Sequence, residues 1–169
     1  NILTLKLAYP NSKWDFTGPM FEKIKKGQVW RLITPCFLHK NFIHLLFNML
    51  WLWILGWQLE QRISRFKFIL LVLIIGIISN VCQYLMSGSN FLGFSGVVLG
   101  FVGFIFSRQK VAPWEGYPLQ RISIIFLLAF VIIMLLMQVV SLIMLLFGYN
   151  FNMPIANSAH VVGATVGFL

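Results

Sequence analysis

The chain has 169 residues, of which 59% are hydrophobic and 16% aromatic but only 10% charged, with a formal net charge of +9. Because a soluble domain carries about 25% charged and about 45–50% apolar residues, this composition excludes an ordinary soluble protein and predicts an all-α polytopic protein in a lipid bilayer. The basic residues cluster at the ends of apolar segments, without the patch typical of nucleic-acid binding. We therefore expect lipid head groups, and not nucleic acid, as their partners.

Five apolar segments can be marked along the chain, taking about 20 residues as the length that spans the hydrocarbon. They cover residues 42–59, 68–86, 95–107, 122–147 and 156–169. Residues 1–9 resemble the tail of an earlier helix, and the fifth segment is still apolar where the chain stops. We expect residues 1–169 to form a single domain, truncated at both ends, with a six-helix core whose first helix is missing or truncated.

The third segment, residues 95–107, is bounded by Arg108 and is too short to cross the hydrocarbon at a rise of about 1.5 Å per residue. A short helix that begins at Ser95 must begin below the membrane surface. The loop before it, residues 87–90, then dips inward, which is tolerated only where it lines a cavity. We expect water to reach Ser95 through that cavity.

Ser95 is the first candidate for chemistry, in the motif Gly93-Phe94-Ser95-Gly96 at the predicted start of a helix. The unpaired N–H groups of a first turn and the positive end of the helix can stabilise an oxyanion. The alternative interpretation is a serine that merely caps the helix.

His160 lies in another apolar segment, with no charged neighbour in sequence. An imidazole can take the hydroxyl proton as a serine oxygen attacks, so Ser95 and His160 together indicate acyl transfer; the alternative is a histidine that only joins helices. Glycines follow both residues at helical spacing, and glycine-faced helices can approach backbone to backbone, which would bring the two side chains together. No acid is placed to complete a triad, so we expect a Ser–His dyad. The acidic residues, all in loops or at segment ends, are Asp15, Glu22, Glu60 and Glu115.

His44 and Asn48 lie one helical turn apart on the first apolar segment, and His39 precedes them. The side-chain N–H groups of His44 and Asn48 can donate hydrogen bonds to an oxyanion. The alternative interpretation is that the two side chains only form hydrogen bonds that join helices. A metal site from the three histidines lacks a carboxylate and an HExxH pattern. Cys36 and Cys82 lack disulfide or zinc-ligand spacing. We expect no metal and no cofactor.

The ordered set of motifs resembles a known family over residues 10–169. The motifs are Trp30-Arg31, His39-x4-His44-x3-Asn48, Gly93-x-Ser95-Gly96 and Ala159-His160-x2-Gly163-x3-Gly167. In this order they resemble the rhomboid intramembrane serine proteases. The resemblance implies a rhomboid-like helical bundle in which Ser95 is the nucleophile and His160 the general base. It places His44, Asn48 and the Ser95 backbone N–H around the oxyanion.

The same resemblance implies roles for three larger segments. The loop with Trp30 and Arg31 would lie partly in the membrane, residues 149–157 would cap the site, and residues 122–147 would gate lateral access of substrate. Two positions depart from the family pattern. Leu99 stands where many members have a tyrosine that stacks on the histidine, and Pro35 where bacterial members often have another histidine.

The hypothesis is therefore an intramembrane serine endopeptidase that cleaves transmembrane segments of membrane-protein substrates. By resemblance we expect a multi-pass protein of the bacterial inner (plasma) membrane, with the active site toward the outer face. One alternative is a non-catalytic rhomboid-like protein that binds transmembrane helices; retention of both Ser95 and His160 favours catalysis. The second alternative is a channel or transporter, and the sequence contains no inverted repeat that would support it.

Overall fold

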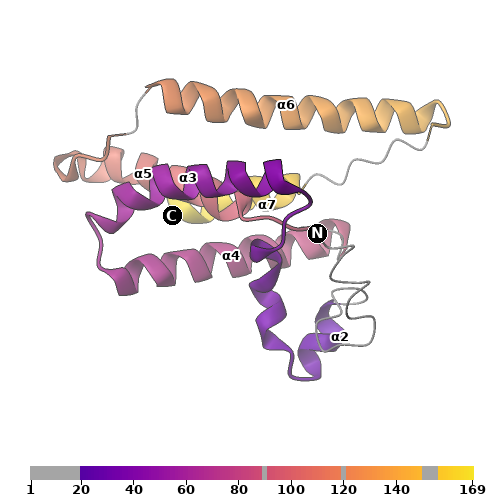
Figure 1. Cartoon of the computed structure of the whole chain (residues 1–169), viewed down its shortest axis with the longest axis horizontal. Helices are drawn as coiled ribbons and strands as arrows, with labels where there is room; N and C mark the ends of the chain where they lie inside the picture. The colour runs from indigo at the N-terminus through magenta and orange to yellow at the C-terminus, as the bar shows by residue number, and fades with distance from the viewer. Residues whose placement is uncertain (1–19, 89–90, 119–120, 150–155) are drawn as a thin grey trace.

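The computed structural model describes residues 20–88, 91–118, 121–149 and 156–169, and in these ranges the regular structure is entirely helical. Short 3-10 helices (η) lie between α2 and α3 and between α5 and α6, and Figure 1 shows the arrangement of the α-helices. In chain order the elements are α2 (Met20–Lys25), η1 (Val29–Leu32), η2 (Thr34–Phe37), α3 (Phe42–Glu60), α4 (Arg65–Ser87), α5 (Ser95–Val111), η3 (Pro113–Glu115), α6 (Arg121–Leu146) and α7 (Asn157–Phe168). The predicted all-α class is confirmed.

Three helices in the described ranges are long and apolar enough to cross a membrane: Phe42–Glu60, Arg65–Ser87 and Ser123–Leu146. Much of their surface is apolar and exposed, as at Phe66, which is 75% exposed, and Leu136, which is 58% exposed. An exposed apolar surface of this extent is stable only against lipid. The prediction of a multi-pass membrane protein is confirmed.

The starts of α3 and α4 follow from local capping. The Asn41 side chain accepts a hydrogen bond from the His44 N–H at 2.8 Å, and the Ser64 hydroxyl accepts one from the Lys67 N–H at 3.4 Å. Each bond satisfies a backbone donor that the first turn of a helix leaves unpaired. The Ser64 cap starts α4 at Arg65, three residues before the apolar run that begins at residue 68.

The predicted end of the third segment at residue 107 is wrong, because α5 continues to Val111. Arg108 and Lys110 lie in its last turn, where cations interact favourably with the negative end of the helix dipole. At about 1.5 Å per residue the helix is about 25 Å long, close to the thickness of the hydrocarbon layer. The inference that Ser95 lies below the surface because its helix is short therefore loses most of its basis.

The bundle is built around the pair α5 and α7, which make the most extensive contact in the described structure. α4 packs against both, and α3 packs against α5. Figure 1 shows α6 lying along the outer side of α3, while α2 and η1 project away from the bundle beside the end of α4. The predicted cap over the site falls largely on residues 150–155, and the predicted tail of an earlier helix on residues 1–9, all outside the described residues.

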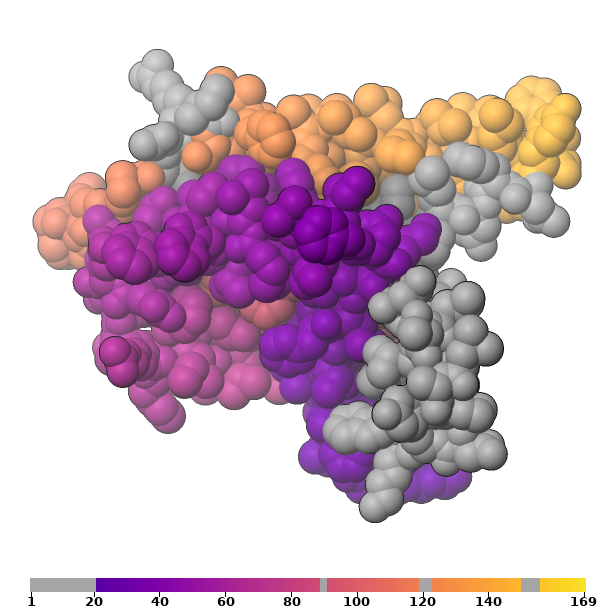
Figure 2. Space-filling view, in the orientation of Figure 1, coloured from indigo at the N-terminus to yellow at the C-terminus, as the bar shows by residue number. Residues whose placement is uncertain are grey.

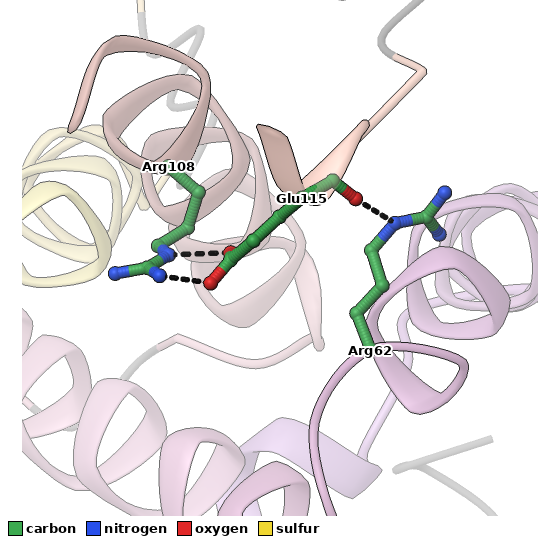
Figure 3. A network of polar contacts seen from close by, with 3 residues as sticks. All are labelled: Arg62, Arg108 and Glu115. Atoms are coloured by element: carbon green, nitrogen blue, oxygen red, sulfur yellow. Dashed lines mark hydrogen bonds and ion pairs between the residues drawn. The ribbon is translucent and has the colours of Figure 1, made fainter. Parts of the chain in front are cut away.

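A polar cluster fastens the end of the bundle opposite to Ser95 (Figure 3). Arg62 donates to the backbone oxygens of Glu115 and Gly116 at 3.0 and 2.8 Å, and Arg108 forms a two-point ion pair with the Glu115 carboxylate. Charge-assisted bonds of this kind are stronger than neutral ones. They tie the end of α3 to the connection between α5 and α6.

Candidate active site

Ser95 is the first residue of α5, and its hydroxyl oxygen lies 2.7 Å from Nε2 of His160. The N-cap position is occupied by Phe94, and no side chain caps the helix, so the interpretation of Ser95 as an N-cap residue is wrong. The Ser95 N–H makes no backbone hydrogen bond within the described residues. The residue thus presents a hydroxyl and an available backbone donor at the same helix end.

His160 lies in the first turn of α7 and is 7% exposed. The helix approaches α5 so closely that a Cβ on Gly163 would overlap the carbonyl oxygen of Gly96, and a Cβ on Gly167 would overlap that of Gly100. The predicted packing of glycine-faced helices is therefore confirmed. It brings together two side chains that are 65 positions apart in sequence.

Gln83 of α4 supports this turn and was not among the predicted site residues. Its Oε1 accepts a hydrogen bond from the Ala159 N–H at 2.9 Å, and it is 3% exposed. Since Ala156 provides no side-chain cap, Gln83 supplies from another helix the acceptor that the start of α7 lacks. The sequence did contain a signal, because a polar side chain inside an apolar span is rare and commonly functional.

His44 lies across from Ser95 on α3, and its ring is held by the backbone just before that helix. Nδ1 accepts a long hydrogen bond, 3.5 Å, from the Lys40 backbone N–H. With Nδ1 as the acceptor, a neutral imidazole carries its proton on Nε2 and donates from there. That nitrogen lies 2.9 Å from where a Cβ on Gly93 would be, beside the motif that contains Ser95.

Asn48 lies one turn along α3 and is 2% exposed. One of its amide hydrogens is donated to the His44 carbonyl at 2.9 Å, which leaves the other free to donate elsewhere. Within the described structure, neither Asn48 nor His44 makes a side-chain hydrogen bond to another helix. The interpretation of the pair as a link between helices therefore has no support.

The four predicted site residues meet on one cavity of about 420 Å³. Polar groups of His44, Asn48, Ser95 and His160 line one side, and apolar side chains of α6 line another. His39 is not part of this lining; its ring packs edge-on against His44 with centroids 5.2 Å apart. Among the described residues, no group of His, Cys, Asp and Glu is arranged to hold a metal ion.

The two positions that depart from the family pattern lie in different surroundings. Leu99 is buried in α5. The backbone oxygen of Pro35 accepts a hydrogen bond from the Gly93 N–H at 3.0 Å. This bond joins η2 to the loop before Ser95, in which Gly93 has a φ of +120°, a conformation open to glycine but strained for other residues.

Comparison with known proteins places this arrangement in a family: the family model of the rhomboid domain matches residues 26–169. The chain belongs to the rhomboid family. The rhomboid protease GlpG of Yersinia pestis (strain Pestoides F) is 37% identical over 144 residues, which are 84% of this chain and 47% of that protein. The rhomboid protease GlpG of Salmonella newport (strain SL254) is 36% identical over 149 residues, 87% of this chain and 49% of that protein.

This rhomboid chain spans about half the length of the curated relatives that it matches. The resemblance found from four short motifs is confirmed over most of the chain. The site brings together a serine hydroxyl, an imidazole in hydrogen-bond contact with it and several N–H donors, the groups from which an activated nucleophile can be built.

Proposed function

We propose that this rhomboid is an intramembrane serine endopeptidase that cleaves transmembrane segments of membrane proteins. Ser95 is the nucleophile and His160 the general base. The observation that carries the proposal is the 2.7 Å contact between Ser95 Oγ and His160 Nε2, at the head of two closely packed helices and on the wall of a cavity. A serine is a weak nucleophile unless a base takes its proton, and this contact provides that base.

In the reaction, Oγ attacks the carbonyl carbon of the scissile peptide bond as Nε2 takes the hydroxyl proton. The oxyanion that forms accepts hydrogen bonds from the Ser95 backbone N–H, from Nε2 of His44 and from the free amide hydrogen of Asn48. His160 then gives its proton to the leaving amine. Water, activated by the same imidazole, hydrolyses the acyl-enzyme and restores Ser95. No metal or other cofactor takes part.

Substrate reaches the cavity from the membrane, between α3 and α6. Aromatic rings of the two helices are in contact: the Phe47 ring lies 4.7 Å from that of Phe130 and 5.9 Å from that of Phe126, and the Trp51 ring lies 5.8 Å from that of Phe126. Figure 2 shows α6 along the edge of the molecule, with α3 below it. Ring contacts of this kind can be exchanged for contacts with lipid or with a substrate helix, because both are equally apolar.

We also propose the setting in which this chemistry takes place. Residues 1–169 form one rhomboid-like domain in a bacterial inner membrane, with the active site toward the outer face. Support for the bacterial setting comes from the relatives, which are rhomboid proteases of Yersinia and Salmonella. The partners are then transmembrane protein substrates and the lipid bilayer, and not nucleic acid.

The test is labelling of the detergent-solubilised protein with a fluorophosphonate, combined with cleavage of a transmembrane substrate in vesicles. The proposal expects both activities in the wild type and neither in Ser95→Ala or His160→Ala. Ser79→Ala is a matched control, because Ser79 is a buried serine of α4 that donates to the Gly76 carbonyl at 3.2 Å and lies outside the cavity.

The result that would overturn the proposal is a folded wild type that neither reacts with the probe nor cleaves. Binding of transmembrane helices by such a protein would establish the non-catalytic alternative. Labelling that persists in Ser95→Ala would show that another residue is the reactive group.

A further inference from the structure

The cavity at Ser95 carries one charged side chain, Lys40, among the described residues that line it. The other polar lining groups are amides, imidazoles and a hydroxyl, and the remainder are apolar. A single fixed charge in such a lining acts over several ångströms, because the surrounding groups screen it less than water does.

Lys40 lies immediately before the cap residue of α3, at the end of the helix that faces the site. Its backbone N–H donates to Nδ1 of His44, while the opposite side of that ring faces Gly93 and the start of α5. The backbone of Lys40 is therefore held against one side of the His44 ring, while the other side of the ring faces the motif that contains Ser95. A flexible four-carbon stem extends about 6 Å from there.

No carboxylate in the described part of the chain neutralises Lys40. Glu115 is paired with Arg108 at the opposite end of the bundle, and Glu60 is the last residue of α3. The remaining described acid, Glu22, lies in α2, and no salt bridge joins it to Lys40. The Lys40 side chain is exposed, so its ammonium can move toward a ligand in the cavity.

We propose that Lys40 selects substrates with an acidic side chain close to the scissile bond, on the side nearer the membrane surface. The inference rests on the proposed protease function and specifies its substrate class: transmembrane segments with an aspartate or glutamate at their boundary. A residue in an extended segment advances about 3.4 Å along the chain. The ammonium therefore reaches carboxylates within about three residues of the bond, and it repels a lysine or arginine at the same positions.

The experiment uses a cleavable transmembrane substrate in which each of three positions on either side of the scissile bond carries Asp, Asn or Lys in turn. The ratio of kcat/KM for Asp to that for Asn is measured in uncharged detergent, so that no anionic head group competes. For the wild type we expect about a fivefold preference for Asp on one side of the bond, the upper end of the range for an exposed ion pair. Lys40→Met abolishes the preference, and Lys40→Glu reverses it toward Lys.

Lys110→Glu is the matched control. Lys110 is an exposed lysine in the last turn of α5, opposite to the site, and the substitution changes the net charge by the same amount. This variant keeps the wild-type ratio. Added salt reduces the wild-type preference, because an exposed charge pair is screened.

The assignment of Lys40 would be overturned if the wild type and both Lys40 variants cleaved the substrates with the same ratio of kcat/KM for Asp to that for Asn. The protease proposal would then stay intact. A preference that changes as much in Lys110→Glu as in Lys40→Glu would overturn it too, since the effect would then come from total charge. Absence of both cleavage and labelling of Ser95 would overturn the two proposals together.

Discussion

Replacing Gly163 by alanine tests whether the close packing of α5 and α7 sets the distance between Ser95 and His160. The added Cβ would overlap the carbonyl oxygen of Gly96 and lie 2.9 Å from its carbonyl carbon. These are atoms of a helical backbone, which cannot rotate away as a side chain can. Because carbon atoms in contact lie about 3.5–4.0 Å apart, the two helices must separate by roughly 1 Å.

That separation acts directly on the proposed dyad. Ser95 is adjacent to Gly96, and His160 lies one turn before Gly163, so the distance of 2.7 Å between Oγ and Nε2 grows to about 3.7 Å, beyond hydrogen-bond range. A displacement of about 1 Å in a catalytic group can lower the rate by about 100-fold. We therefore expect Gly163→Ala to reduce the rate of fluorophosphonate labelling per folded molecule by about that factor.

The assay combines the labelling rate with thermal unfolding, so that loss of geometry is distinguished from loss of folded protein. Gly56→Ala is the control: Gly56 is a buried glycine of α3, and its added Cβ would meet the Leu52 and Phe68 side chains at 3.4 and 3.5 Å, an ordinary contact. The Gly56→Ala protein should react with the fluorophosphonate at the wild-type rate. The reasoning is refuted if Gly163→Ala has a lower unfolding temperature but labels at an unchanged rate per folded molecule.

Substitutions at three further residues test other contacts. Gln83→Leu leaves the buried N–H of Ala159 without its acceptor, which costs about 1–3 kcal/mol; it should slow labelling, and Gln83→Glu, which retains an acceptor oxygen, should restore part of the rate. Gly93→Ala would put a Cβ 2.8 Å from Cε1 of His44; displacing this donor should lower kcat by about 100-fold, measured on a transmembrane substrate, with a smaller change in KM. Hydrogen bonding to its arginine partner lowers the pKa of Glu115, so this carboxylate stabilises the fold above its ordinary pKa and the effect is lost as pH falls through the lowered one. Glu115→Gln should therefore lower the unfolding temperature at pH 7, and equal melting of the two proteins at that pH would contradict the inference; the difference should fade below about pH 4.

The sequence was sufficient to pair Ser95 with His160 because each is followed by glycines at helical spacing. That spacing specifies a face, and a face without side chains can pack only against another backbone. The start of α3 was predicted correctly because the apolar run begins at Phe42, and in the structure the Asn41 cap lies directly before it. Local rules of this kind act within one or two turns and can be read from the chain.

The sequence was not sufficient for contacts that join distant residues without a repeating pattern. Gln83 meets a backbone N–H 76 positions away, and Arg62 meets the carbonyls of a connection more than 50 positions away. A backbone group has the same chemistry at every residue, so nothing in the sequence marks which one a side chain will reach. The end of α5 was misplaced at Arg108 because a charged residue was taken as the boundary of the helix, whereas it marks only the boundary of the apolar layer.

The packing of the bundle matches the different demands that the proposed proteolysis within a membrane makes on its parts. The proposed dyad lies on α5 and α7, the most closely packed helices, because a nucleophile and its base must be held to within about 0.5 Å. α6 instead borders the cavity through Phe130, Met134 and Met137, and it is mostly exposed along its length. In the proposed reaction a transmembrane substrate reaches Ser95 past one of the helices that border the cavity. Displacing α6 leaves the contact between Ser95 and His160 intact, whereas displacing α7 would break it, so the loosely packed helix is the one through which access is compatible with catalysis.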